Sequence, residues 1–159
     1  MTEDARFEDA GERPLRLKAL EPDDLPVIAA LTQDAVFPAA EMTWDRAKRR
    51  FAILLNRFRW EDRPAAEKRR RDFERVQSVL SVEDVMAVKS QGIDRADRDI
   101  VLSLLTVAFE PGEDGTGWIE MTLAGDGAIA LHVEALEITL RDVTRPYAAP
   151  SQKVPGHPK

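Results

Sequence analysis

The sequence contains no cysteine and only two histidines, which excludes several kinds of chemistry at once. Without cysteine there are no disulfides, no thiol catalysis and no thiolate metal ligands. A zinc site would have to consist mostly of carboxylates, which zinc rarely accepts, and His132 and His157 stand far apart in the sequence. We therefore expect no zinc centre and no other cofactor.

Long apolar runs are also missing. The longest nearly continuous one, residues 100–109, has about half the length that a membrane-spanning helix needs. The first fourteen residues have neither the basic region nor the apolar region of a secretory signal. These observations predict a soluble, cytoplasmic protein that does not associate with membranes.

The motifs of common enzymes are absent as well. The glycine-rich run at 111–117 lacks the lysine of a P-loop, carries two acidic residues and precedes a predicted strand. No serine lies in an elbow motif with a histidine to activate it. Asp94, Asp97 and Asp99 alternate with arginines and do not follow the calcium-loop pattern. A non-enzymatic protein is favoured, although carboxylates from distant strands could still meet in the fold.

Positive charge is concentrated in one part of an otherwise acidic chain. The chain carries 23 Lys and Arg against 29 Asp and Glu, a net charge of −6. Residues 46–75 hold twelve of the basic residues and only five acidic ones. Such asymmetry indicates an anionic partner, or else a basic loop that lies against the protein's own acidic surface.

Aromatic residues are interleaved with arginines in this basic segment. Arg-Phe-Arg-Trp occupies 57–60, and Phe73 follows the four basic residues at 68–71. Arginine forms fork-shaped pairs with phosphates, and tryptophan offers a face for base stacking. The alternative is that the aromatic residues pack in the core while the charges are solvated in a loop. The candidate binding residues are Arg57, Arg59, Trp60, Arg69, Arg70 and Arg71.

Alternation of apolar and polar residues predicts an α+β fold that is mainly antiparallel β. The clearest pattern is a hairpin at 118–134 with its turn at Gly125-Asp126-Gly127. The alternation then shifts phase, so a bulge or bend is expected near 134–135. About eight or nine strands would form a barrel or sandwich, and a pleckstrin-homology-like barrel is one candidate. Strands are also predicted over 15–19, 41–44, 50–60, 76–82, 85–90 and 100–109.

One short helix is predicted near the N-terminus. Glu21-Pro22-Asp23-Asp24 is typical of a helix start, and Pro26 suits the first turn. The helix would have only about two turns, so docking must stabilise it. Residues 61–72 are highly charged and contain Pro64, which predicts a loop.

Both ends of the chain are predicted to be tails. Residues 1–14 are acidic without a hydrophobic period, which is typical of disorder. Residues 144–159 contain four prolines, which predicts a second disordered tail. A single globular domain would then occupy residues 15–143, a suitable length for one core.

Several runs together resemble an uncharacterised bacterial family, domain of unknown function 2948. The most specific are Asn56-Arg57-Phe58-Arg59-Trp60 and Gly92-Ile93-Asp94, supported by Gln33-Asp34-Ala35 and Val101-Leu102-Ser103-Leu104-Leu105. The resemblance covers nearly all of residues 15–143. It implies no activity, no cofactor and no site residues, because the family has no established function.

Three functions stay open on these grounds. We favour a non-enzymatic binding or protein-interaction module with a partner protein. The second is an accessory protein that binds nucleic acid or phosphate through residues 46–75. The third is a small-molecule enzyme with carboxylate chemistry. The sequence does not indicate an oligomeric state.

Overall fold

The structure is a computed structural model that describes residues 13–94 and 96–156. Most of the predicted acidic tail, residues 1–14, lies outside this part of the chain. The same is true of residues 157–159 and of residue 95.

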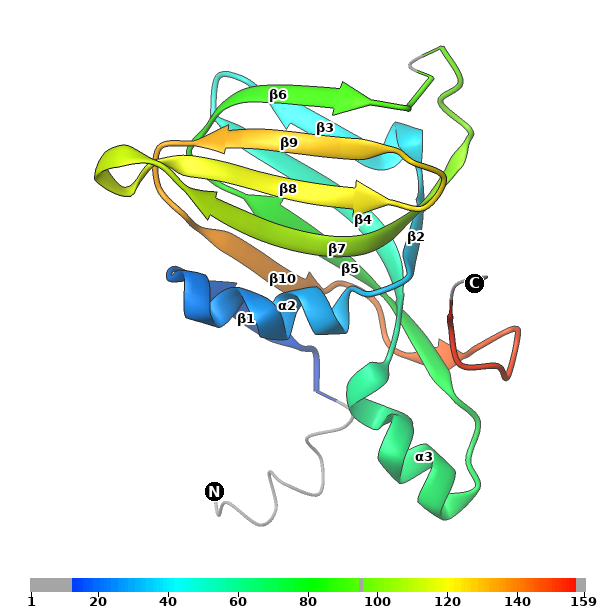
Figure 1. The fold of residues 1–159 in the computed structure, drawn as a ribbon. Helices are drawn as coiled ribbons and strands as arrows, with labels where there is room; N and C mark the ends of the chain where they lie inside the picture. Colours follow the sequence, from blue (N-terminus) through cyan, green and yellow to red (C-terminus); the bar gives the residue numbers. More distant parts are fainter. Residues whose placement is uncertain (1–12, 95, 157–159) are drawn as a thin grey trace.

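Within the described residues, eleven strands form one antiparallel sheet (Figure 1). Mainly antiparallel β structure is therefore confirmed, with more strands than the eight or nine predicted. The strands are β1 (Arg16–Ala19), β2 (Ala35–Pro38), β3 (Met42–Asp45), β4 (Arg50–Phe58), β5 (Glu74–Val82), β6 (Val85–Gln91), β7 (Val101–Pro111), β8 (Gly117–Leu123), β9 (Ala128–Val133), β10 (Ile138–Asp142) and β11 (Tyr147–Ala148).

The sheet curls on itself but is not closed. Its strand order is β1-β10-β5-β4-β2-β7-β8-β9-β6, with β11 beside β5 and β3 beside β4. The two ends of this path, β1 and β6, do not pair with each other. In Figure 1, β6 to β9 lie in front of β3, β4 and β5, so the sheet forms two layers around a core.

Strand β4 connects the two layers because one of its edges pairs with β5 and the other pairs with two strands, β3 and β2. The first half of β4 pairs with β3, and Asn56 in its second half pairs with Val36 of β2. Strand β2 then pairs with β7 of the other layer. The side chains of Phe51, Ile53 and Leu55 alternate into the core along this strand.

The hairpin of β8 and β9 has the predicted turn. Gly125 and Asp126 both have positive φ, 79° and 68°, and the Leu123 N–H closes the turn by donating to the Gly127 carbonyl at 2.8 Å. Ile119 and Met121 point into the core from β8. After β9 the chain leaves this layer and enters β10, near the bend expected at 134–135.

In the part of the chain that the structure describes, two α-helices and four 3₁₀ turns accompany the sheet. The turns are η1 (Pro22–Asp24), η2 (Ala39–Glu41), η3 (Trp60–Asp62) and η4 (Glu113–Gly115). Helix α2 (Leu25–Leu31) buries Leu25 and Ile28 and packs against β7. Helix α3 (Arg63–Arg69) lies in the segment predicted as a loop. That prediction was wrong because Pro64 occupies the first turn of α3, where its missing N–H leaves no bond unmade.

The C-terminal segment from residue 144 packs on the sheet, unlike the tail that its prolines predict. Tyr147 and Ala148 form β11 on β5, and Ala149 is buried. The Gln152 side chain accepts a hydrogen bond from the Phe73 N–H at 2.7 Å. Prolines flank this two-residue strand without entering it, so they do not disturb the pairing.

The loop between β6 and β7 is anchored at both ends. Near β6, Gly92 has φ of 69°, and a Cβ there would lie 2.9 Å from the Asp126 carbonyl oxygen. Near β7, the carbonyls of Arg98 and Ile100 accept hydrogen bonds from Ala40 and Ala39, each 2.9 Å long. The loop is thus fixed between the β8–β9 turn and the start of β3.

We expect Gly92→Ala to destabilise the protein by roughly 1–3 kcal/mol, because it combines a positive φ with a backbone clash. The measurement is the urea midpoint of unfolding. Gly156→Ala is the matched control, since a Cβ at Gly156 meets nothing within 4 Å. Equal midpoints for the two variants would contradict the close packing of Gly92 on the β8–β9 turn.

Candidate functional site

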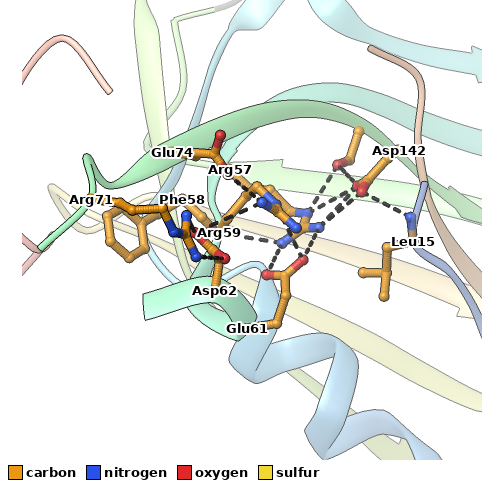
Figure 2. A network of polar contacts seen from close by, with 10 residues as sticks. Leu15, Arg57, Phe58, Arg59, Glu61, Asp62, Arg71, Glu74 and Asp142 are labelled. Atoms are coloured by element: carbon orange, nitrogen blue, oxygen red, sulfur yellow. Dashed lines mark hydrogen bonds and ion pairs between the residues drawn. The ribbon is translucent and has the colours of Figure 1, made fainter. Parts of the chain in front are cut away.

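Arg57, the first of the six candidate binding residues, is buried inside the protein. Its side chain has 0% exposure and lies between Glu61 and Asp142 (Figure 2). The two Nη atoms donate to Glu61 at 2.9 and 2.8 Å, and Nη2 also donates to Asp142 at 3.0 Å. The Nε atom donates to the Ser78 hydroxyl at 3.0 Å. All three nitrogens are therefore used internally.

Asp142 collects further hydrogen bonds from other strands. It accepts one from the Leu15 N–H at 2.9 Å and one from the Ser78 hydroxyl at 2.7 Å. Burial by itself lowers the pKa of Arg57, but hydrogen bonds and charge from Glu61 and Asp142 outweigh it and raise that pKa. Arg57 is thus a permanent cation that joins β4, β5, β10 and the start of β1.

Arg59 and Trp60 are also engaged within the fold. Arg59 is 4% exposed and forms an ion pair with Glu74. Trp60 is half-buried, packs edge-on against Phe58 at 4.8 Å, and donates from Nε1 to the Gln33 carbonyl at 3.1 Å. Arg57, Arg59 and Trp60 therefore do not form one exposed surface, because carboxylates and packing occupy these side chains. The alternative of aromatic packing fits Phe58, which is buried, but Arg57 and Arg59 are paired inside the fold and are not solvated in a loop.

The remaining candidates lie at the end of α3. Arg71 is exposed and forms an ion pair with Asp62 at 2.9 Å. Arg69 and Arg70 are exposed, and no ion pair of either is seen within residues 13–94 and 96–156. Helix α3 projects away from the sheet (Figure 1). A basic surface thus exists there, but it is smaller than predicted and has no exposed tryptophan.

A cavity of about 860 Å³ opens between β3 and β6, which we name the β3–β6 cavity. This volume lies within the range of small-molecule pockets, about 300–1,000 Å³. Its wall includes Met42 and Trp44 on β3, Phe51 on β4 and Val88 on β6. These four side chains belong to the hydrophobic core or pack against it. The cavity is therefore an extension of the core that is open to solvent.

The cavity exists because the sheet is not closed at this point. Among the described strands, β3 pairs only with β4 and β6 only with β9. At one end the gap is closed by a hydrogen bond from the Val85 N–H to the Arg49 carbonyl, 2.8 Å long. At the other end it is closed by the bond from Ala40 to Arg98. A bounded opening results, rather than a groove that runs through the wall.

Charged side chains surround the opening. Arg46, Arg49, Arg98 and Asp94 line the cavity. Arg49 forms an ion pair with Glu134, and Asp94 accepts a hydrogen bond from the Ala96 N–H at 2.9 Å. The rim therefore has a positive charge in a protein whose net charge is −6.

Sequence reasoning did not identify this cavity. Its wall comes from residues 39–51, 85–98 and 129, which no local pattern connects. Two signals were available: Trp44 lies in a predicted strand, and Ile93-Asp94 belong to a run that carries the family resemblance. Neither shows that β3 and β6 come together.

Two features are missing from the part of the chain that the structure describes. It contains no helix long and apolar enough to cross a membrane. It also contains no group of three or more histidine and acidic side chains that could hold a metal ion.

We expect Arg57→Met to lower the free energy of unfolding by roughly 3–5 kcal/mol, because it leaves Asp142 buried without its cation. Urea denaturation measures this loss. Adding Asp142→Leu to Arg57→Met should recover part of it, because the unpaired carboxylate is then gone. Arg50→Met removes an exposed ion pair with Glu83 and should change the midpoint little. A similar midpoint for Arg57→Met and the unmodified protein would contradict the role of this ion pair.

The chain was also compared with known proteins. No curated protein and no solved structure matches it. Residues 15–157 match the family described as "Protein of unknown function (DUF2948)". The match includes Arg57, Asp142 and all of the β3–β6 cavity wall. This protein therefore belongs to the DUF2948 family, whose function is uncharacterised.

Proposed function

We propose that this protein is a non-enzymatic binding module that takes a small molecule with an apolar body into the β3–β6 cavity. The observation that carries the proposal is the cavity itself: an opening of about 860 Å³ whose wall continues the hydrophobic core. The predicted cytoplasmic location and bacterial origin suit this role and stay predictions.

Burial of apolar surface supports the proposal. An apolar body that buries about 200 Å² gains roughly 5 kcal/mol at about 25 cal/mol per Å². Association itself costs at least about 4 kcal/mol, so apolar contacts alone give weak binding. A ligand of useful affinity therefore needs polar contacts at the rim as well. The curled sheet would hold such a ligand as small β-barrels hold one at their mouth.

The shape of the opening favours a small molecule over an extended peptide. Strand addition needs an edge along which a peptide backbone can run. Here the hydrogen bonds from Val85 to Arg49 and from Ala40 to Arg98 close both ends of the opening. Catalysis is not favoured, because Asp94 is the only carboxylate on the wall and it already caps a turn.

The proposal predicts that N-phenyl-1-naphthylamine, an uncharged fluorophore, binds the protein with increased fluorescence. Val88→Trp should weaken this binding at least tenfold by filling the cavity. Val88 faces inward, since it pairs with the buried Leu131, whereas Lys89 lies over the Trp118 ring on the opposite face. Fluorescence titration gives the dissociation constants.

Thr122→Trp is the matched control, because it adds the same side chain at an exposed position of β8. Binding to this variant should equal that of the unmodified protein, and thermal unfolding should show that both variants are folded. If the probe does not bind, or binds the Val88→Trp variant equally well, the β3–β6 cavity is not a binding site.

A second candidate function, the binding of nucleic acid, rests on α3. Lys68, Arg69 and Arg70 are exposed at its end, and within the described residues they form no ion pair. Three cations at a projecting helix end could contact phosphates, but they are few for stable binding at physiological salt.

If α3 binds nucleic acid, Arg69→Glu with Arg70→Glu should abolish the binding of single-stranded DNA measured by fluorescence anisotropy. Arg16→Glu with Arg141→Glu, an exposed pair on β1 and β10, is the control. The affinity of the unmodified protein should also fall steeply as salt is added, because phosphate contacts release counterions. Equal loss in both double variants would show a general effect of net charge and no site at α3.

A further inference from the structure

We infer that the ligand of the β3–β6 cavity is an amphipathic anion whose carboxylate or phosphate head group pairs with one of two arginines at the rim, Arg46 or Arg98. This inference rests on the proposed function and adds the chemical class of the ligand.

The sign of the charge at the opening is opposite to that of the whole protein. Three arginines and one aspartate line the cavity, whereas the chain has a net charge of −6. Arg49 is already paired with Glu134, and Asp94 caps its own turn. The cations left at the opening are Arg46 and Arg98.

Within the described residues, neighbouring acids form no ion pair with these two arginines. Asp97 and Asp99 flank Arg98 in the sequence, but neither lines the cavity. The Asp97 carboxylate accepts a hydrogen bond from the Asp99 N–H, and Asp45 accepts one from the Lys48 N–H. Across residues 13–94 and 96–156, no ion pair involves Arg46 or Arg98, so both guanidinium groups have donors to offer a ligand.

The two arginines lie at opposite ends of β3. Arg46 directly follows the last residue of β3, and the Arg98 backbone is bonded to Ala40, just before its first residue. A four-residue strand rises by roughly 10 Å between its ends. A ligand body of about this length can extend past Trp44 while its head group reaches an arginine.

Guanidinium groups suit this task because they form fork-shaped hydrogen bonds with carboxylates and phosphates. An ion pair at an open rim is screened by water, so its contribution to affinity is modest. The ion pair would determine which head group is preferred, while the apolar wall supplies the larger part of the binding energy.

The test measures how well three ligands of equal chain length displace N-phenyl-1-naphthylamine: decanoate, decyl phosphate and decanol. The two anions are used below their micellar concentrations and decanol below its solubility limit. At low salt, we expect the anions to displace the probe at roughly three- to tenfold lower concentration than decanol. The better of the two anions identifies a carboxylate or a phosphate as the preferred head group. The advantage of the anions should shrink as salt is added.

In Arg46→Gln with Arg98→Gln, the anions should lose this advantage while the uncharged probe binds unchanged. Arg16→Gln with Arg141→Gln removes the same charge elsewhere and should keep the advantage. The inference is overturned if decanol displaces the probe as well as the anions do, or if the advantage survives in the Arg46 and Arg98 variant. A protein that does not bind the probe at all overturns the proposed function, and the inference with it.

Discussion

Arg57 and Asp142 meet where β4, β5 and β10 lie side by side, and their ion pair is shielded from water. Taking two charges out of water is costly, and apolar side chains of similar size could fill the same space with less penalty. Apolar side chains, however, would not specify one relative arrangement of these strands. Arg57 finds all its acceptors only when Ser78, Asp142 and Glu61 stand in the present register.

That register determines where the sheet remains open. With β4 fixed against β5, its opposite edge takes β3 along the first half and β2 along the second. On its other side β2 pairs with β7, and β8, β9 and β6 follow β7 in the order of the sheet. These strands curl over the core, so that β6 approaches β3 without pairing with it. The β3–β6 cavity therefore results from the pairing of one edge of β4 with two strands, β3 and β2. The cavity itself lies far from Arg57 in the sheet.

Local sequence signals predicted what depends on neighbours and missed what depends on distant strands. The β8–β9 hairpin follows from alternation and two turn residues, Gly125 and Asp126. Arg57 stands two residues after Leu55, so strict alternation would put it on the inward face of β4, but its charge made it a candidate binding residue instead. Its partner Asp142 is 85 residues away, so no local pattern showed how a buried charge is satisfied. The cavity wall depends on the same kind of distant pairing.

The charge excess of residues 46–75 illustrates what composition alone does not show. A count treats every arginine alike, but solvation and pairing make them different. Arg57 and Arg59 are held by carboxylates inside the fold, so they contribute no charge that a partner can reach. Arg46, at the start of the same segment, lies on the cavity rim with Arg98. The anionic ligand that we propose would therefore contact the first residue of the basic segment and not its middle, because charge and apolar surface occur together at that first residue.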